Sequence, residues 1–350
     1  MPSRTTTQNP RFPARSRAGT RRTTLADVAA EVGVSAITVS RALNRPELVQ
    51  AELRDRILRV VERLAYVPDP AARALASRRA PTVVALVPSL ANAVFVELLE
   101  SVQAVCDRAG LQLLIGNTHY RPADEERLLR LHLAAAPSGV LLAGFERTPA
   151  AAQLLAEAEV PTVYMMELPP TPGVHCVGFD QRAAARALME ALWTRGRKRI
   201  GFVGAQLDRR TMERAEGWRG AALEIGEWSP AREVLSPEPS SPALGAQLFD
   251  RLLAAAPDTD AVFFGNDDLA AGALARARER GLAVPEQIAI AGFNDLPFAA
   301  WLAPALTTVR TPRVEVGRRA AERLVALIRG EDLPVTAEDL GFEVILRESA

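Results

Sequence analysis

The sequence lacks the features of membrane, secreted and disulfide-stabilised proteins. No run of eighteen apolar residues occurs, and the first 22 residues contain no apolar stretch of the kind that a secretory signal needs. The two cysteines, Cys106 and Cys176, are far apart and form no CxxC pair, which predicts reduced core residues. The three histidines show no metal-ligand spacing. We therefore expect a globular cytoplasmic protein without a bound metal.

Signatures of common enzymes are absent too. The chain contains no Walker loop, no GxSxG elbow, no HExxH and no Gly-rich dinucleotide fingerprint. The sequence therefore predicts neither an enzyme nor a cofactor. With 350 residues, 48% of them hydrophobic, the chain is long enough for two or three domains with cores of their own.

Charge is distributed unevenly along the chain. Residues 1–80 contain 15 Lys and Arg against 7 Asp and Glu, a net charge of +8, whereas the rest contains 27 against 35, a net charge of −8. This asymmetry favours a basic module that binds a polyanion, attached to a body that does not. The alternative is a basic disordered tail, and we expect residues 1–22 to be one.

From Thr23 onward the pattern predicts three short helices over residues 23–67. Thr24 followed three residues later by Asp27 is typical of a capping box, and apolar residues at helical spacing follow. Gly33 is expected to end this helix and Ser35 to cap a second one. Two short helices joined by a Gly-containing turn are typical of a helix-turn-helix unit. A third helix is expected from about residue 51 to residue 64.

The second helix, in VSAITVSRALN, has polar and apolar side chains that its core does not need. An inward apolar stripe leaves five side chains for binding, mainly near the N-terminal end: Ala36, Ile37, Thr38, Ser40 and Arg41. In the major groove, Arg can bind guanine through two hydrogen bonds, apolar groups can touch a thymine methyl, and hydroxyls can donate to phosphates. The alternative is a helical packing unit with an exposed Ile, because this geometry also occurs without DNA.

The stretch YVPDPAARALAS indicates a separate element, which we place at residues 68–80. Asp69 can cap a short helix that starts at Pro70 and has almost no core-facing stripe, so it would be marginal alone. We interpret it as a hinge helix that folds on DNA, with Arg73 as a DNA contact and Leu75 as an apolar wedge for the minor groove. The alternative is a plain interdomain linker.

Residues 81–350 alternate short apolar runs with helical patterns. The runs are TVVALV, LQLLIG, GVLLAG, TVYMM, RIGFVG, AVFFGN and QIAIAG. This alternation predicts a parallel sheet with helices on both faces, and a second set of units beginning near Asp180 predicts two lobes. Ligands of such sheets bind beyond the carboxyl ends of the strands, so a cleft between two lobes is the expected site.

Polar residues that follow these runs are the candidates for the cleft, and Phe95 could supply an apolar face for a sugar ring. Each polar candidate could instead be a helix cap or a turn residue, because polar side chains favour those positions. The candidates are Ser89, Asn117, Glu167, Asp180, Asn266, Asp267, Asn294 and Asp295.

Several stretches together resemble one known family. TLADVAAEVGVSAITVSRALN, ARAL, GNDDLAAGAL, VPEQIAIAGFND and PALTTVRTP are similar, in this order, to the lactose-repressor (LacI/GalR) family of bacterial transcription regulators, from Thr23 to the C-terminus. VPSLANAVF, HYRPADEERL, VGFDQRAAAR and LDRRT look most like its gluconate-type repressors. Ala36 and Ile37 depart from the hydrogen-bonding pair that the family often has there.

The resemblance implies a function and an architecture. A homodimer would bind near-palindromic double-stranded operator DNA, usually as a repressor, under the control of a small effector. The body would have two periplasmic-binding-protein-like lobes, with the chain crossing near residues 179, 309 and 338. Effector contacts would come from Ser89, Phe95, Arg214, Asn266 and Asn294, while Asp267 looks more like a helix cap and Asp180 like part of the lobe crossing. The alternative is a cytoplasmic sugar-binding protein without DNA binding.

One departure from the family pattern, at Asn294, bears on the identity of the effector. Family members that bind neutral sugars commonly have an aspartate at the position of Asn294, and an aspartate would repel an acidic ligand in a dry cleft. The loop LDRRT adds Arg209 and Arg210 before a helix N-terminus, with Arg214 one turn on. We therefore expect a sugar acid such as gluconate, its carboxylate bound by Arg214 or by the Arg209/Arg210 pair, and its hydroxyls by Asn266 and Asn294. The alternative is that the arginine pair is solvated and Asn294 is a turn residue.

Overall fold

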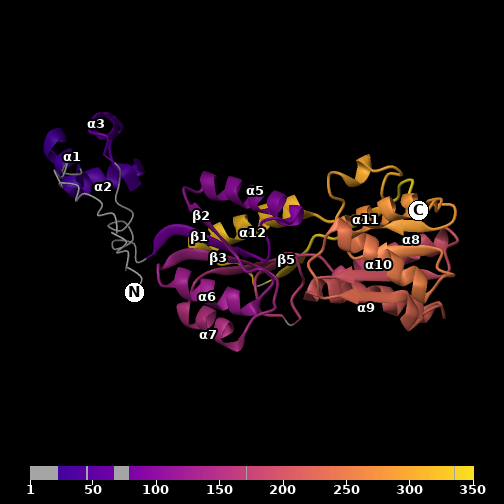
Figure 1. Cartoon of the computed structure of the whole chain (residues 1–350). Coiled ribbons are helices and arrows are strands. Elements are labelled where there is room, and N and C mark those ends of the chain that lie inside the picture. The colour runs from indigo at the N-terminus through magenta and orange to yellow at the C-terminus, as the bar shows by residue number, and fades with distance from the viewer. Residues whose placement is uncertain (1–22, 45, 67–78, 171, 335) are drawn as a thin grey trace, which may run out of the picture. The chain divides into compact units, whose positions relative to one another are not determined.

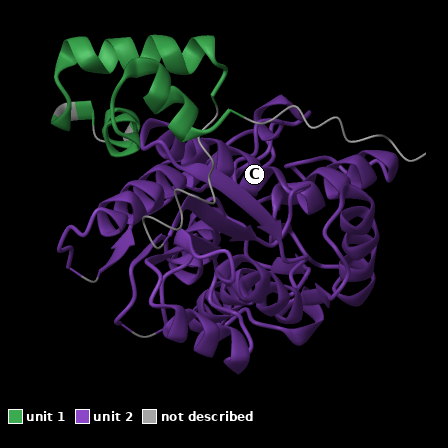
Figure 2. Cartoon of the chain, turned by 90° about the vertical axis from the view of Figure 1, so that its left-hand side faces the viewer, with its two compact units in different colours: residues 1–76 green, residues 77–350 purple. Residues whose placement is uncertain are grey.

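The computed structural model describes residues 23–44, 46–66, 79–170, 172–334 and 336–350. The chain divides into two compact units, residues 1–76 and 77–350 (Figure 2). The predicted arm over residues 1–22 and most of the predicted hinge, with Arg73 and Leu75, lie outside the described residues.

The first unit is a set of three short helices, α1 (Leu25–Val32), α2 (Ala36–Asn44) and α3 (Ala51–Arg63), with a 3₁₀ turn η1 (Pro46–Leu48) before α3. The predicted capping box of α1 is present. The Thr24 N–H donates to the Asp27 carboxylate at 2.8 Å, and the Asp27 N–H donates to Thr24 Oγ1 at 3.3 Å. Gly33 ends α1 in the left-handed conformation (φ 78°), which glycine adopts without steric cost. The predicted helix-turn-helix unit is confirmed.

The first unit has a small apolar core of its own. Val28 of α1, Val39 of α2 and Ile57 of α3 are fully buried and belong to one cluster between the three helices. Each comes from the inward stripe of an amphipathic helix, so the three helices stabilise one another although each is too short to be stable alone.

The second unit contains two lobes, each built on a parallel sheet (Figure 1). The sheet of the first lobe has the strand order β11-β5-β4-β3-β1-β2, and every pair in it is parallel. Helices α5 and α12 pack on one face, and α6 and α7 on the other. The elements are β1 (Ala80–Val87), α5 (Ala93–Arg108), β2 (Gln112–Asn117), α6 (Pro122–Leu133), β3 (Pro137–Ala143), α7 (Pro149–Ala158), β4 (Thr162–Met165), β5 (Cys176–Gly178), α12 (Arg313–Ile328) and β11 (Ala337–Asp339).

The second lobe has a four-stranded parallel sheet of order β7-β6-β8-β9. Helices α8 and α9 pack together on one face, and α10 and α11 on the other. The elements are α8 (Gln181–Thr194), β6 (Ile200–Ala205), α9 (Arg209–Glu224), η2 (Pro230–Arg232), β7 (Glu233–Ser236), α10 (Pro242–Ala255), β8 (Ala261–Phe264), α11 (Asp267–Glu279), β9 (Ala289–Ala291) and η3 (Ala299–Trp301).

The chain passes between the lobes three times. It leaves the first lobe after β5, returns after β10 (Thr308–Arg310), and crosses again between β11 and β12 (Glu343–Ile345). Strands β10 and β12 pair antiparallel beside the second lobe. All seven predicted apolar runs form strands of parallel sheets, which confirms the two-lobed α/β architecture. Within the described residues, no helix is both long and apolar enough to cross a membrane.

Candidate functional site

The outward face of α2 carries the side chains predicted to bind DNA. Ala36, Ile37 and Arg41 are exposed, and Ile37 keeps 64% of its surface accessible. Thr38 and Ser40 are half-buried. The Thr38 N–H donates to Ser35 Oγ at 3.1 Å, and the two hydroxyls are 2.9 Å apart, so Ser35 caps α2 as predicted. An isoleucine left this exposed at a helix N-terminus, beside an exposed arginine, has no role in the core of the unit.

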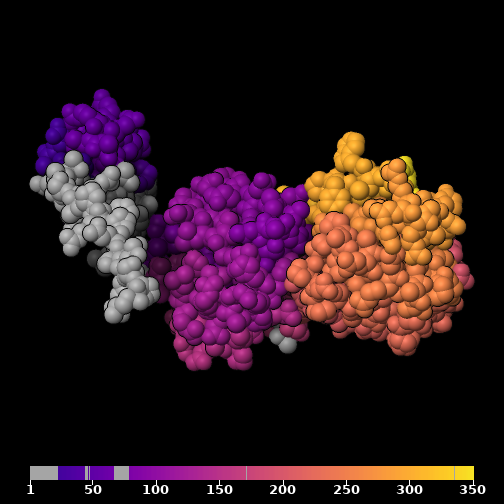
Figure 3. Space-filling view, in the orientation of Figure 1, coloured from indigo at the N-terminus to yellow at the C-terminus, as the bar shows by residue number. Residues whose placement is uncertain are grey.

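The second candidate site is a cavity between the two lobes, along the seam visible in Figure 3. Segments that follow β1, β2, β4, β6, β7, β8 and β9 meet there, at the carboxyl ends of parallel strands, as expected for this class of fold. The lining residues of the first lobe are Asn92, Val94, Phe95, Tyr120 and Met166, and those of the second are Ala205, Gln206, Asp208, Arg210, Thr211, Arg214, Ser240, Asn266 and Asn294.

Among the residues that the structure describes, Arg210 is one of two buried cations that line this cavity. It lies in the first turn of α9 and is 7% exposed, so the idea that it is a solvated surface charge is wrong. Its Nε and Nη2 donate to the Asp208 carboxylate at 2.9 and 2.5 Å. Its guanidinium lies 5.3 Å from the centre of the Phe95 ring. Buried Nη1 finds no hydrogen-bond partner in the described part of the chain.

Arg214, one turn further along α9, has two of its nitrogen atoms already bound. Nε donates to Gln181 Oε1 at 2.8 Å, and Nη1 donates to the Gly265 carbonyl at 2.6 Å. The guanidinium stacks 3.9 Å from the centre of the Phe293 ring. Burial lowers the pKa of Arg214 to about 10, so it is still charged near neutral pH.

Glu167 lies behind the arginines and does not line the cavity. It is 2% exposed, and its carboxylate is 3.6 Å from Arg210 Nε and 3.8 Å from Arg209 Nε. Burial raises the pKa of Glu167 to about 7, against the opposing effect of the Arg210 charge. Glu167 therefore takes up a proton at a higher pH than an exposed glutamate does.

Two asparagines of the second lobe line the cavity in different ways. Asn266 caps α11: its Oδ1 accepts from the Leu269 N–H at 3.0 Å, and its Nδ2 donates to Ser240 Oγ at 2.8 Å. Asn294 is 4% exposed, and among the described residues its Oδ1 has no hydrogen-bond partner. Its backbone is left-handed, with φ 116°.

The prediction that Asp267 caps a helix is wrong. Asn266 has the extended backbone that an N-cap requires, which leaves Asp267 as the first residue of α11. The fully buried Asp267 carboxylate instead accepts from Thr308 Oγ1 at 2.6 Å and from the Leu296 N–H at 2.7 Å. It connects α11 to β10 and to the loop after β9.

Other candidates have local structural roles away from the cavity lining. Ser89 accepts from the N–H groups of Ala91 and Asn92, and Asn117 from that of His119, so both form turns. Arg209 pairs with Glu213 at 2.8 Å. The remaining two are Asp180, which caps α8, and Asp295, which binds Arg310 and Arg347.

Sequence reasoning missed several residues that line the cavity: Asn92, Tyr120, Asp208, Thr211 and Ser240. Asn92 caps α5 and donates to the Tyr120 hydroxyl at 3.3 Å, and Asp208 caps α9, which begins two residues before the predicted start. A search for helix caps after each strand would have found both Asn92 and Asp208.

Comparison with known proteins agrees with this arrangement. Residues 24–69 match the profile of "Bacterial regulatory proteins, lacI family", and residues 189–350 match "Periplasmic binding protein-like domain". Regulators named "HTH-type transcriptional regulator GntR" are 51% identical in Pseudomonas aeruginosa (94% of this chain, 96% of the relative) and 36% identical in Escherichia coli K12 (92% and 97%).

Solved structures give the same result. The transcription regulator GntR from Chromobacterium violaceum is 49% identical with a TM-score of 0.75, over 77% of this chain and 98% of that one. A LacI-family regulator from Silicibacter pomeroyi is 35% identical with a TM-score of 0.82, over 93% and 99%. These relatives are regulators, which confirms the expectation that the chain is not an enzyme. With its helix-turn-helix unit and two-lobed body, the chain belongs to the lacI family of DNA-binding transcriptional regulators.

Proposed function

We propose that this regulator is a homodimeric repressor whose affinity for a near-palindromic operator is controlled by a sugar acid such as gluconate. The observation that carries the proposal is the pair of buried guanidinium groups that line the cavity, Arg210 and Arg214, and Nη1 of Arg210 has no hydrogen-bond partner in the described chain. An unpaired buried donor of a charged group is costly, and a ligand carboxylate would satisfy it with a charge-assisted hydrogen bond.

The rest of the cavity suits a polyhydroxylated ligand. Asn294, Asn266, Ser240, Tyr120 and Asn92 all present amide or hydroxyl groups to it. Such groups both donate and accept, which is what a chain of sugar hydroxyls requires. Asn294 Oδ1, which no described residue binds, can accept from a ligand hydroxyl without adding a charge that would repel the carboxylate.

Among the three arginines of the LDRRT region and the turn after it, Arg210 and Arg214 are the two candidates for the carboxylate. Each has two nitrogen atoms bound within the protein, those of Arg210 by the Asp208 carboxylate and those of Arg214 by the uncharged Gln181 and Gly265. Arg209 pairs with Glu213 and does not line the cavity. The resemblance of this stretch to gluconate-type repressors supports the same ligand class.

Calorimetry with gluconate and with glucose tests the effector. We expect gluconate to bind the full-length protein at least about tenfold more tightly than glucose, because one charge-assisted hydrogen bond is worth about 1.5 to 3 kcal/mol. At least one of Arg210→Gln and Arg214→Gln should remove most of this preference, whereas Arg209→Gln, the matched control at the neighbouring position, should keep it. Equal affinity for the two ligands would refute the sugar-acid assignment.

A homodimer is supported by an apolar groove on the first lobe. Leu90, Val96, Leu99, Leu113 and Ile115 line it, beside α5 and the edge strand β2, and Leu90, Val96 and Ile115 are exposed. A contiguous apolar patch along a sheet edge is typical of a surface that a second copy covers. Two copies related by a two-fold axis would present their α2 helices to two half-sites of chromosomal operator DNA in the cytoplasm.

A further inference from the structure

The loop after β9 has an unusual backbone at the point where it meets the cavity. Asn294 and Asp295 are consecutive non-glycine residues with positive φ, 116° and 52°. Such a backbone conformation is unfavourable for a side-chain-bearing residue, and persists only where the surroundings hold it in place. Something other than local preference therefore fixes the direction in which the Asn294 side chain points.

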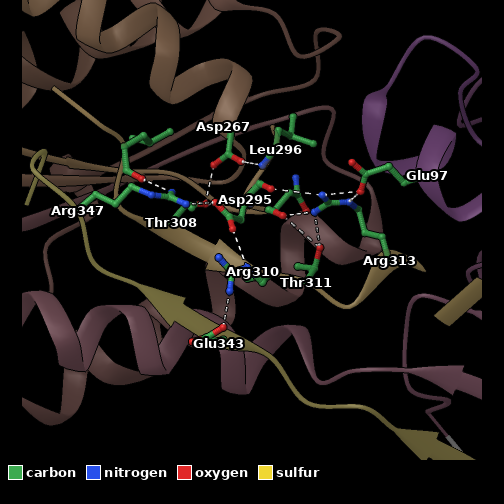
Figure 4. A network of polar contacts seen from close by, with 12 residues as sticks. Glu97, Asp267, Asp295, Leu296, Thr308, Arg310, Thr311, Arg313, Glu343 and Arg347 are labelled. Atoms are coloured by element: carbon green, nitrogen blue, oxygen red, sulfur yellow. Dashed lines mark hydrogen bonds and ion pairs between the residues drawn. The ribbon is translucent and has the colours of Figure 1, made fainter. Parts of the chain in front are cut away.

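Three arginines hold this loop, and Figure 4 shows them converging on it from different directions. Arg310 Nε and Arg347 Nη2 bind the two carboxylate oxygens of Asp295, at 2.8 and 2.7 Å. Arg313 binds the main chain instead: Nη1 donates to the Asn294 carbonyl, and Nη2 to the Asp295 carbonyl at 3.3 Å.

Arg313 belongs to the first lobe, where it also binds Glu97. Its Nε donates to Glu97 Oε2 at 2.9 Å, and its Nη2 lies 2.8 Å from the same oxygen (Figure 4). Glu97 is on α5, which packs on the sheet of the first lobe. Arg313 is the first residue of α12, and at Gly317, one turn on, a Cβ would lie 2.4 Å from the Leu98 carbonyl, so α12 and α5 are in close backbone contact.

The guanidinium of Arg313 is therefore a junction between the cavity and the first lobe. It is 7% exposed, and it joins the main chain of a cavity-lining residue to a carboxylate on α5. Arg310 and Arg347 hold the same loop, but their other partners, Glu343 and the Leu306 carbonyl, do not belong to α5. Of the three arginines, Arg313 is the one with a bond to Glu97 in the described structure.

We propose that Arg313 is a positioning residue that aims Asn294 at the effector and, through Glu97, couples effector occupancy to the arrangement of the two lobes. The coupling part rests on the proposed function. A ligand that binds Asn294 favours the lobe arrangement in which Arg313 bonds both partners, and any lobe arrangement that moves Arg313 and Glu97 together away from this loop releases the Asn294 main chain. By linkage, the effector then changes operator affinity by the same factor by which operator changes effector affinity.

Glu97→Gln tests the coupling in full-length protein, with Glu100→Gln, exposed on the same helix, as the control. We expect Glu97→Gln to keep gluconate affinity within about threefold, but to reduce at least fivefold the factor by which gluconate changes operator affinity, a factor that typically lies between about 5 and 150. Arg313→Lys, which cannot bond both carbonyls and Glu97, should also weaken gluconate binding about tenfold. An unchanged coupling factor in Glu97→Gln would overturn the proposal.

Hydrogen exchange without any ligand tests the same link if gluconate proves to be the wrong effector. The Asn294 N–H donates to the Val309 carbonyl and the Leu296 N–H to Asp267, so both amides report on the loop. Glu97→Gln should speed their exchange at least threefold although Glu97 lies on the other lobe, and Glu100→Gln should not. If Glu97→Gln changed exchange only within α5, Arg313 would not transmit anything between the lobes, whatever the effector is.

Discussion

The DNA-binding face and the effector cavity are built in opposite ways. The described candidate DNA contacts come from a single helix, α2, and three of the five are exposed. The cavity residues come from segments that follow strands of two separate sheets, and Arg210, Arg214 and Asn294 are each more than nine-tenths buried. The three exposed side chains of α2 do not belong to the core of their unit. In the cavity the candidate ligand contacts also hold the protein together, so function and stability cannot be separated there.

The largest expected effect is in the buried network beside the cavity. Asp267→Ala leaves the Thr308 hydroxyl and the Leu296 N–H buried without their acceptor. Since each such group costs about 1 to 3 kcal/mol, we expect the free energy of unfolding to fall by about 3 kcal/mol. Urea denaturation measures this, and Asp268→Ala, at the next and partly exposed position, should cost less than about 1 kcal/mol. A comparable loss in both variants would mean that the network has no special role.

The next effect concerns pH and Glu167. Its pKa is raised to about 7 in the folded protein, so between about pH 4.5 and pH 7 the folded state binds more protons than the unfolded state. Stability therefore falls as pH rises through this window, by roughly 3 kcal/mol from this group. Glu167→Gln should remove that part of the pH dependence and be the more stable protein at pH 8. Denaturation curves of both proteins at pH 5 and pH 8 measure this difference. A Glu167→Gln variant less stable than the wild type at pH 8 would contradict a raised pKa of Glu167.

A substitution on the DNA-binding face should have the smallest effect on the free energy of unfolding. Arg41→Ala should weaken operator binding by about 2 kcal/mol and relax the preference at one base pair, while non-specific DNA affinity stays nearly the same. Because Arg41 is exposed, its free energy of unfolding should change by less than about 0.5 kcal/mol. Binding titrations on operator and random DNA measure this. An equal loss on both DNAs would exclude a base contact, and a large loss of stability would erase the contrast with the cavity.

Periodicity and apolar runs predicted most of the fold. Each of the seven predicted apolar runs became a strand, whereas the short strands β7, β10, β11 and β12 were missed because they contain few consecutive apolar residues and their pairing is set by distant segments. The helix starts at Thr24 and Ser35 followed from capping chemistry alone. These features depend on neighbours within a few residues, which a sequence shows directly.

The candidate site was predicted less completely. Polar residues after strands, the LDRRT loop and the family resemblance together pointed to Arg210, Arg214, Asn266 and Asn294, which all line one cavity, but they could not show which of their atoms are already bound. The bond of Arg214 to Gln181 spans 33 residues, and no local rule predicts it. The cap of α11 is Asn266 and not the adjacent Asp267, because the backbone conformation at position 266 decides which side chain caps the helix.

The separate core of the helix-turn-helix unit has an evolutionary consequence. Val28, Val39 and Ile57 pack among α1, α2 and α3, and no residue of the two-lobed body belongs to that core within the described chain. Substitutions on the outer face of α2 therefore need no compensating change in the body, and substitutions in the cavity need none in α2. Operator preference and ligand preference can diverge independently, so gene duplication followed by recombination at the boundary can create new pairings of signal and target.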